Sequence, residues 1–172
     1  EMAPYELDAS AVVTEEREDV RLRAAREDDL AFLRTSLTGF MRDVWGERYD
    51  VDEAQVESMA VRFATGHGDD EWHYVLEQRG EDGQWRSASI AACRRPSADT
   101  RRVRLLYTPP AFRRSGLGKA IVRSMLTDLL ARSSATITLF ADVAQASVNR
   151  LYVSCGFRPV GTSIIYNLAV DA

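Results

Sequence analysis

A glycine-containing turn with basic side chains is the part of this sequence that most directly suggests chemistry. The segment YTPPAFRRSGLGKA (Tyr107–Ala120) lies between a strand-like run and an apolar, helix-like run. The first N–H groups of a helix have no partner within it, and the helix dipole adds positive charge at the same end. Gly116 and Gly118 let an anion approach the backbone closely, because glycine has no Cβ. The turn is therefore predicted to bind an anion, although a merely tight loop with incidental glycines also explains it.

Two common phosphate-binding motifs do not fit this turn. A P-loop, GxxxxGK[ST], needs glycine where Arg113 stands and a metal-binding hydroxyl where Ala120 stands. A dinucleotide fingerprint, GxGxxG, needs a third glycine where the chain has Ile121. The turn thus favours neither ATP nor NAD, and a phosphate- or nucleotide-binding module is the weakest of the functional alternatives.

The remaining pattern, Arg113-x-x-Gly116-x-Gly118, resembles the acetyl-CoA-binding loop of the GCN5-related N-acetyltransferase (GNAT) superfamily. That loop has the form [Q/R]-x-x-G-x-[G/A] and joins a strand to a helix. The resemblance extends from Val20 to about Tyr166 but is specific only from Tyr107 to Pro159. It implies an α/β fold: a mixed, mainly antiparallel central sheet with a parallel, splayed strand pair and flanking helices.

A second segment, VNRLYVSCGF, strengthens the resemblance. It places Asn149, Tyr152, Gly156 and Phe157 in the order of the family's C-terminal segment, after a further strand. The resemblance implies acetyl-CoA as co-substrate, with its pyrophosphate on the loop N–H groups and its pantetheine amides along the end of the preceding strand. The cofactor-binding residues it implies are Leu106, Tyr107, Thr108, Arg113, Arg114, Ser115, Gly116, Leu117, Gly118, Lys119 and Asn149.

Tyr152 is the predicted catalytic residue, as the proton donor to the departing CoA thiolate. A phenol is protonated at neutral pH and is available as an acid. Asn149 lies about one helical turn away on the same face and is predicted to bind a CoA amide. A backbone N–H near Tyr107 or Thr108 is expected to polarise the thioester carbonyl.

The general base is not evident. The strand TRRVRLLYT contains no carboxylate, so the expectation is Asp142 or an ordered water, with Glu77 and His73 as weaker candidates. Cys155 is not expected to be a nucleophile, because apolar burial and a helix C-terminus both disfavour a thiolate. Direct transfer in a ternary complex is therefore expected.

The hydrophobic pattern predicts one strand, two helices, three strands, a helix, a strand, a helix and one or two final strands. Ile121, Val122, Met125, Leu126 and Leu129 are expected to face inward from the third helix. The predicted ranges are Val20–Ala25, Arg26–Trp45, Glu53–Ala64, Glu71–Gln78, Trp85–Arg95, Thr100–Thr108, Gly118–Ala131, Ala135–Asp142, Ser147–Cys155 and Phe157–Val170. Residues 1–18 are expected to be a tail or short cap, and 19–172 a single domain.

Composition limits the partners. A net charge of −4 argues against general nucleic-acid binding and modestly favours cationic partners. No run approaches the length of a membrane span, and no signal pattern opens the chain. Cys93 and Cys155 are expected to be buried free thiols in a reducing cytoplasm. His67 and His73 have no ligand-spaced partners, so no metal site is expected.

The function expected is an acetyl-CoA-dependent N-acetyltransferase acting on a primary amine. The alternative is a non-catalytic acyl-CoA-binding or regulatory module on the same fold. The acceptor is a small-molecule amine or a protein amine, and a homodimer is possible. Trp45, Tyr49, Trp72 and Trp85 suggest an amphipathic acceptor pocket, although core or surface packing explains these aromatic residues equally well.

Overall fold

The computed structural model describes residues 1–12, 17–46, 50–66, 68 and 70–162. Its strands are β1 Met2–Leu7, β2 Val20–Ala24, β3 Glu71–Arg79, β4 Trp85–Ser97, β5 Thr100–Tyr107, β6 Thr136–Asp142 and β7 Phe157–Pro159. Its α-helices are α1 Leu30–Trp45, α2 Glu53–Thr65, α3 Leu117–Arg132 and α4 Ala146–Ser154. Its 3₁₀ turns are η1 Ala9–Ala11, η2 Glu27–Asp29 and η3 Pro110–Phe112.

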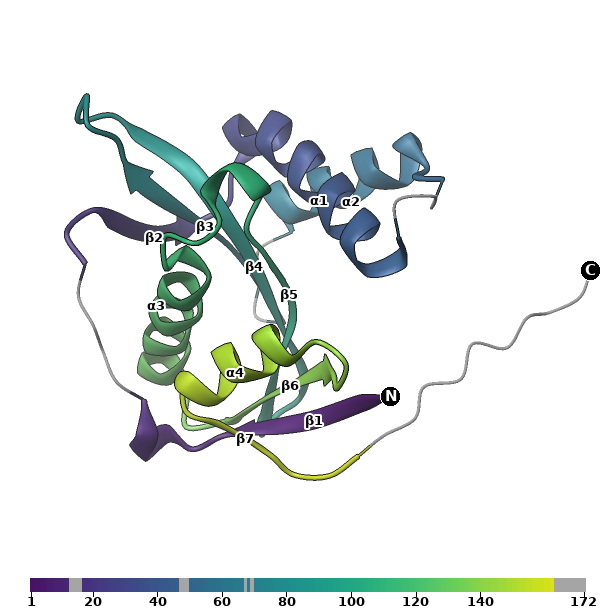
Figure 1. Ribbon diagram of the computed structural model, residues 1–172, viewed down its shortest axis with the longest axis vertical. Coiled ribbons are helices and arrows are strands. Elements are labelled where there is room, and N and C mark those ends of the chain that lie inside the picture. Colours follow the sequence, from purple (N-terminus) through teal and green to yellow (C-terminus); the bar gives the residue numbers. More distant parts are fainter. Residues whose placement is uncertain (13–16, 47–49, 67, 69, 163–172) are drawn as a thin grey trace, which may run out of the picture.

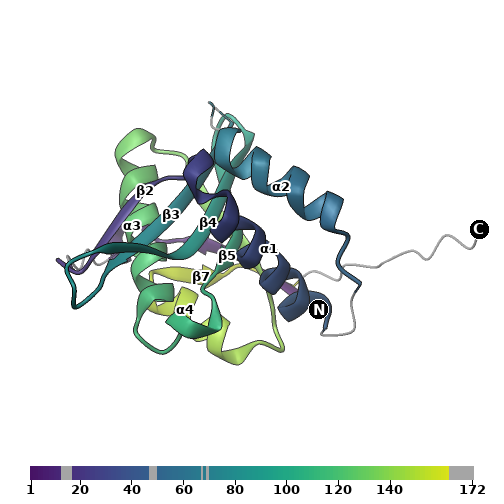
Figure 2. The same ribbon diagram turned by 90° about the horizontal axis from the view of Figure 1, so that it is seen from above.

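All seven strands form one sheet in the order β2-β3-β4-β5-β6-β1-β7. β5 and β6 are parallel and every other neighbouring pair is antiparallel. Helices α1 and α2 lie together on one side of the sheet, and α3 lies on the other (Figures 1 and 2). The predicted mixed, mainly antiparallel sheet with one parallel pair is confirmed.

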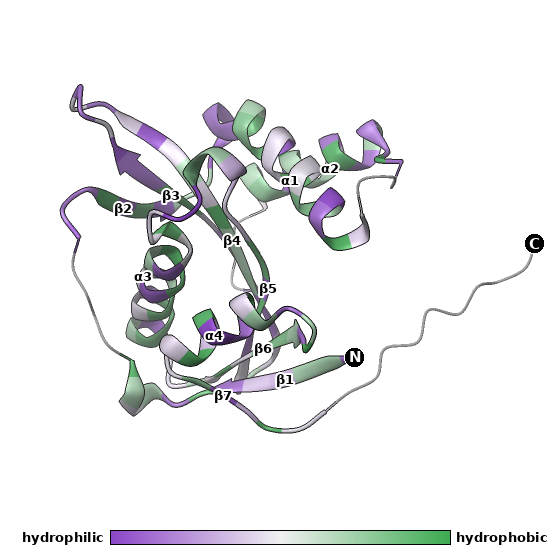
Figure 3. Ribbon diagram, viewed as in Figure 1, coloured by the Kyte–Doolittle hydropathy of each residue, from purple (hydrophilic) through white to green (hydrophobic). Residues whose placement is uncertain are grey.

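Two apolar clusters hold the layers together, one on each face of the sheet. Helix α3 buries Ile121, Val122, Met125, Leu126 and Leu129, each at most 2% exposed, against the first face. This confirms the inward side predicted for the helix. Helices α1 and α2 cover the second face (Figure 3), where the buried residues include Leu33, Leu37, Val56, Ala60, Phe63, Val75, Ile90, Leu105 and Tyr107. No helix of the described chain is long and apolar enough to cross a membrane.

The N-terminal segment corrects one prediction. Residues 2–7, expected to belong to a tail or cap, form strand β1 inside the sheet, between β6 and β7. Ala3, Tyr5 and Leu7 alternate into the core. Pro4 interrupts the run, and a proline within an apolar alternation argues against an internal strand because it lacks an N–H donor. Its carbonyl still accepts a hydrogen bond from Val160 N–H at 2.9 Å.

The C-terminal prediction is tested only in part. Phe157–Pro159 is a short strand, β7, paired with β1. The remainder of the strand or strands predicted up to Val170 lies, from residue 163 onward, outside the described residues.

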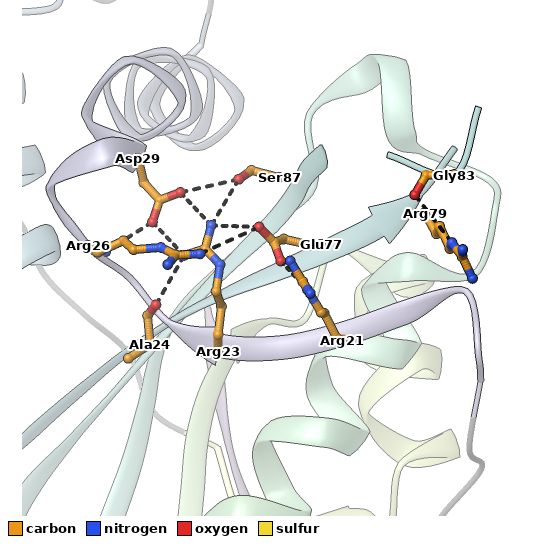
Figure 4. A network of polar contacts seen from close by, with 9 residues as sticks. All are labelled: Arg21, Arg23, Ala24, Arg26, Asp29, Glu77, Arg79, Gly83 and Ser87. Carbon is orange, nitrogen blue, oxygen red and sulfur yellow. Dashed lines mark hydrogen bonds and ion pairs between the residues drawn. The ribbon is translucent and has the colours of Figure 1, made fainter. Parts of the chain in front are cut away.

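A buried ionic network joins β2, β3, β4 and the start of α1 (Figure 4). Arg23 contacts both carboxylate oxygens of Asp29 at 2.7 Å and Glu77 at 2.9 Å. Arg21 donates to Glu77 at 2.5 Å, and Ser87 donates to Asp29 at 3.3 Å. Asp29 and Glu77 are both buried, so the arginines provide the hydrogen bonds that compensate for the loss of water.

The network predicts loss of stability in acid. Burial raises the pKa of Asp29, but hydrogen bonds from the Arg23 guanidinium and Arg26 N–H outweigh it, so the pKa lies below its usual value. Because the folded-state pKa is lowered, the stabilisation is present above about pH 5 and is lost as pH falls through the folded-state pKa. We expect Asp29→Asn to lower the free energy of unfolding at pH 7 by roughly 1–3 kcal/mol.

Urea unfolding at pH 7 and pH 3 checks this prediction. The difference between wild type and Asp29→Asn should shrink at pH 3, where the wild-type carboxylates take up protons. The exposed carboxylate Asp99, which makes no side-chain hydrogen bond or ion pair to the described residues, provides a matched Asp→Asn control that should change the free energy of unfolding little at either pH. An Asp29→Asn difference that does not shrink with falling pH would contradict the assigned charge state.

Candidate active site

The parallel pair β5–β6 separates partway along its length. The two strands pair only where residues 100–103 of β5 lie beside residues 136–139 of β6. Beyond this point β6 continues beside β1, while residues 104–107 of β5 have no strand partner on their β6 side within the described chain. Figure 1 shows β5 directed toward η3 and the start of α3, away from β6. The end of β5 thus has backbone groups available for an extended ligand.

The loop after β5 has the conformation that its glycine permits. Pro110–Phe112 form a 3₁₀ turn, and Gly116 caps α3 in the left-handed region, at φ 79°. Arg114 is also left-handed, at φ 64°, and it is the one such residue other than glycine in the described part of the chain. Left-handed backbone at a non-glycine residue is strained and often accompanies a functional site. The observed helix begins at Leu117, one residue before the predicted start.

The backbone N–H groups of residues 114–119 form a consecutive, unused set. No hydrogen bond joins any of them to an acceptor within the described residues, and α3 has no side-chain cap. The first bond of the helix runs from Ala120 N–H to the Gly116 carbonyl at 3.0 Å. Orphan N–H groups at the start of a 16-residue helix, together with the helix dipole, favour an anion. This loop contains most of the predicted cofactor-binding residues.

Gly118 lies where the loop approaches α4 and the end of β5. A Cβ at this position would lie 3.3 Å from Leu151 Cδ1 and 3.9 Å from Thr108 Oγ1. The glycine therefore leaves space between three elements that the chain brings together at this point. A Cβ at Gly116 would approach Arg17 Nη1 at 3.2 Å, and the Arg17 guanidinium donates to the Ser115 carbonyl at 3.1 Å.

The Arg113 side chain makes hydrogen bonds to other parts of the protein. Its Nε donates to the Thr108 carbonyl at 2.9 Å, and its Nη2 contacts Asp43 of α1 at 2.6 Å. The guanidinium also lies 5.5 Å from the ring centroid of Tyr107. These contacts tie the loop to α1 and to the end of β5. The geometry supports a positioning role for Arg113, and its predicted contact with the cofactor stays a prediction.

The end of β5 is held by a serine that the sequence did not single out. Ser89 of β4 is fully buried, and its hydroxyl donates to the Tyr107 carbonyl at 2.8 Å and lies 2.8 Å from Thr108 Oγ1. Tyr107 is buried beneath α1, where Gly39 leaves room for its phenol. Leu106 packs against the cluster on the opposite face. A serine within a mainly apolar strand offers no sequence signal for such a role.

Asn149 joins the start of α4 to the end of β6. Its side-chain amide donates to the Asp142 carbonyl at 2.9 Å and to the Val143 carbonyl at 3.3 Å. Its oxygen accepts from the Tyr5 hydroxyl at 3.1 Å. The side chain is thus held in one orientation by β1 and β6, and its contact with a CoA amide stays a prediction.

Tyr152 lies on the inward side of α4. It is 8% exposed and packs near the rings of Tyr5 and Phe157, with centroids 6.4 and 5.9 Å away. Burial raises its pKa to about 12. Its hydroxyl makes no hydrogen bond to the described residues, so the phenol proton is held at neutral pH and is not committed to a protein acceptor.

The structure does not bring the base candidates together. Asp142 caps its own turn by accepting from Ala144 N–H at 3.0 Å. Glu77 belongs to the ionic network, and His73 stacks on Phe63 under α2. Burial raises the pKa of the Cys155 thiol, which agrees with the expectation that it is not a nucleophile.

The aromatic residues expected to share a pocket lie apart. Trp72 packs with the cluster under α3, Trp85 contacts Arg21 at the β3–β4 hairpin, and Trp45 is exposed at the end of α1. Tyr49 lies outside the described residues, as does His67. The expectation of a common pocket is therefore wrong for the three tryptophans. Both cysteines are free and buried, as predicted.

Comparison with known proteins supports the sequence resemblance. Residues 87–164 match the family model described as FR47-like protein. A search of curated proteins found no match to this chain. The family match covers β4 to β7 and so includes the loop, Asn149 and Tyr152.

Solved structures share the fold at low sequence identity. An acetyltransferase of the GNAT family from Novosphingobium aromaticivorans is 21% identical, with a TM-score of 0.58, over 93% of this chain and 61% of its own. The chain thus spans less than two thirds of that protein. PaiA N-acetyltransferase from Thermoplasma acidophilum, in complex with coenzyme A, is 13% identical, with a TM-score of 0.63, over 84% and 92%. A spermidine N-acetyltransferase from Vibrio cholerae is 15% identical, with a TM-score of 0.62, over 84% and 83%.

Proposed function

We propose that the chain, which shares the fold of GNAT acetyltransferases, belongs to that superfamily and is an acetyl-CoA-dependent N-acetyltransferase acting on a primary amine. The observation that carries the proposal is the set of unused N–H groups at residues 114–119, next to a strand end without a partner. An ADP-containing thioester needs both features: donors for its pyrophosphate and backbone groups for its amide-bearing arm. The structural relative from Thermoplasma was solved with coenzyme A.

The loop and the strand end have distinct roles in this proposal. The N–H groups of residues 114–119 bind the pyrophosphate, and Gly118 leaves space for the cofactor beside Thr108 and Leu151. The backbone of Leu106 to Thr108 pairs with the pantetheine amides in place of a β6 partner. Arg113 and Ser89 hold this backbone in position through the carbonyls of Thr108 and Tyr107.

Acetyl-CoA supplies the acetyl group as a thioester. A neutral acceptor amine forms the new C–N bond with the acetyl carbonyl carbon, and the C–S bond to CoA breaks. The amine loses one proton to water or to a base, and Tyr152 donates one proton to the departing thiolate. A backbone N–H near Tyr107 or Thr108 stabilises the charge that develops on the carbonyl oxygen. Tyr152 suits its role because its raised pKa keeps the phenol protonated.

A thiol-release assay tests the proposal. Purified protein is incubated with acetyl-CoA and a panel of primary amines, and free CoA is measured alongside the mass of the acetylated amine. We expect CoA release that depends on the amine, together with one acetyl group gained per amine. Binding of acetyl-CoA without turnover on any amine would instead indicate an acyl-CoA-binding module. Tight ATP binding without acetyl-CoA binding would contradict the proposal entirely.

A further inference from the structure

A cavity of about 300 Å³ lies beside the proposed active site, on the face of the sheet covered by α1 and α2. Its apolar lining comes from both helices and from the neighbouring strands β4 and β5. The apolar side chains that line it are Leu37, Phe40, Met59, Phe63, Ala92 and Leu105. The cavity therefore has room and apolar surface for a small organic molecule.

The polar border of this cavity is rich in arginine. Arg62, Arg94 and Arg104 line it, together with Glu71 and His73. Arg62 pairs with Glu71 at 2.7 Å, so their charges offset one another. Arg94 and Arg104 are exposed and make no ion pair within the described residues. The cavity thus carries local positive charge, although the net charge of the chain is −4. This local charge favours an anionic group, whereas the net charge favours a cationic partner.

A β-bulge places Arg104 at this border. Ala92 of β4 pairs with Leu105, but the next residue, Cys93, pairs with Val103, so Arg104 is an extra residue on β5. A bulge redirects the side chain of the extra residue and is often found beside active sites. Arg104 and its neighbour Leu105 consequently both line the cavity, although adjacent residues of a regular strand point to opposite faces.

The cavity lies on the same face of the sheet as the side chain of Tyr107, at the end of β5 where the reaction centre is proposed. Leu105 and Tyr107 belong to the same apolar cluster on this face, and Phe40 packs against Tyr107 with ring centroids 6.3 Å apart. Arg104 precedes Tyr107 by three residues, which corresponds to about 7–10 Å along a bulged strand. Residues 104–107 are also those without a β6 partner in the described chain.

We propose that the acceptor is a small amine that also carries an anionic group, a carboxylate or a phosphate, about 7–10 Å from the reacting nitrogen. This inference rests on the proposed acetyltransferase function. Arg94 and Arg104 bind the anionic group, because guanidinium groups form charge-assisted hydrogen bonds with carboxylates and phosphates. The apolar linker lies against Phe40 and Leu105. The amine then lies at the end of β5, where the thioester carbonyl is placed.

Three amines of one chain length test this class. The three compounds differ only in the group remote from the reacting amine. This group is a carboxylate in 6-aminohexanoate, a methyl group in hexylamine and an ammonium group in 1,6-diaminohexane. We expect kcat/KM for 6-aminohexanoate to exceed those of the other two by about 10-fold or more. A fourth amine, 6-aminohexyl phosphate, is compared with 6-aminohexanoate to show whether a phosphate or a carboxylate is preferred. Equal or faster acetylation of hexylamine or diaminohexane would overturn the proposal.

Single substitutions locate the preference. Arg104→Gln and Arg94→Gln should each reduce the advantage of 6-aminohexanoate over hexylamine, measured as the ratio of the two kcat/KM values in the same variant. Arg95→Gln is the matched control, because Arg95 is the next residue of β4, pairs with Asp70 and does not line the cavity. It should keep the full preference. A preference that survives in both Arg94→Gln and Arg104→Gln would overturn the assignment.

A binding measurement separates this inference from the proposed function. Calorimetry with 6-acetamidohexanoate, the acetylated product, needs no turnover, and acetyl-CoA is titrated in parallel. Binding of this product to wild type and its loss in Arg104→Gln supports the cavity assignment, even where no amine is acetylated and the proposed activity fails. Acetyl-CoA binding or turnover without any binding of 6-acetamidohexanoate overturns the assignment and leaves the proposed function intact.

Discussion

Replacing Tyr152 by phenylalanine is expected to lower kcat by about 10²–10⁴-fold, the range typical of a lost general acid. The affinity for acetyl-CoA should change by less than about two-fold, since the phenol is proposed to act on the departing thiolate. The fold should be retained, because the ring keeps its packing against Tyr5 and Phe157 and the hydroxyl has no partner in the described chain. Steady-state kinetics and calorimetry of acetyl-CoA binding measure the two quantities separately.

Tyr74→Phe is the matched control for this substitution. Tyr74 is a second buried tyrosine, and its hydroxyl donates to Asp128 of α3 at 2.7 Å, apart from the loop and the strand end. Loss of the Tyr74 hydroxyl should lower the free energy of unfolding without the drop in kcat that is expected for Tyr152→Phe. The pH profile gives a further check, because a Tyr152 pKa raised to about 12 predicts no tyrosine ionisation in kcat between pH 6 and pH 9. An unchanged kcat in Tyr152→Phe removes the residue from the mechanism.

Replacing Gly118 by valine is expected to weaken acetyl-CoA binding by about 100-fold or more, roughly 2.7 kcal/mol. The Cβ would lie 3.3 Å from Leu151 and 3.9 Å from Thr108, so the branched methyl groups enter the space proposed for the cofactor. Gly118→Ala adds the Cβ alone and should weaken binding much less. Acetyl-CoA titration of both variants, with thermal unfolding to confirm their fold, measures the difference. Normal binding in Gly118→Val would mean that the loop does not hold the cofactor.

Much of the fold was predictable because its signals are local and periodic. The inward residues of α3 repeat at helical spacing, and all five that were predicted to be buried are buried. Strand β1 was missed for an equally local reason, because Pro4 interrupts a short run whose pairing partners, β6 and β7, come more than 130 residues later. Only tertiary pairing identifies such a strand.

The site was predictable where backbone chemistry defines it and not where side-chain packing does. The loop from Arg113 to Lys119 was predicted from its glycines, and the N–H groups of residues 114–119 have no hydrogen-bond acceptor among the described residues. Its role as the cofactor site stays a prediction. The contact of Arg113 with Asp43, 70 residues earlier, cannot be inferred from spacing. The same holds for the cavity, because a bulge in β5 places Arg104 beside residues from α1 and α2. Residues from five elements, α1, α2, β3, β4 and β5, meet there without any shared motif.

Backbone amide chemical shifts of residues 114–119 test the central proposal most directly. In a ¹⁵N-labelled sample, adding CoA should shift these amide signals downfield together, because N–H groups that have no acceptor among the described residues gain a phosphate acceptor. Inorganic pyrophosphate should shift the same signals at higher concentration, while the amides of α2 stay unchanged. CoA binding that leaves the 114–119 amides unmoved, with shifts elsewhere on the protein, would contradict the assignment of this loop as the cofactor site.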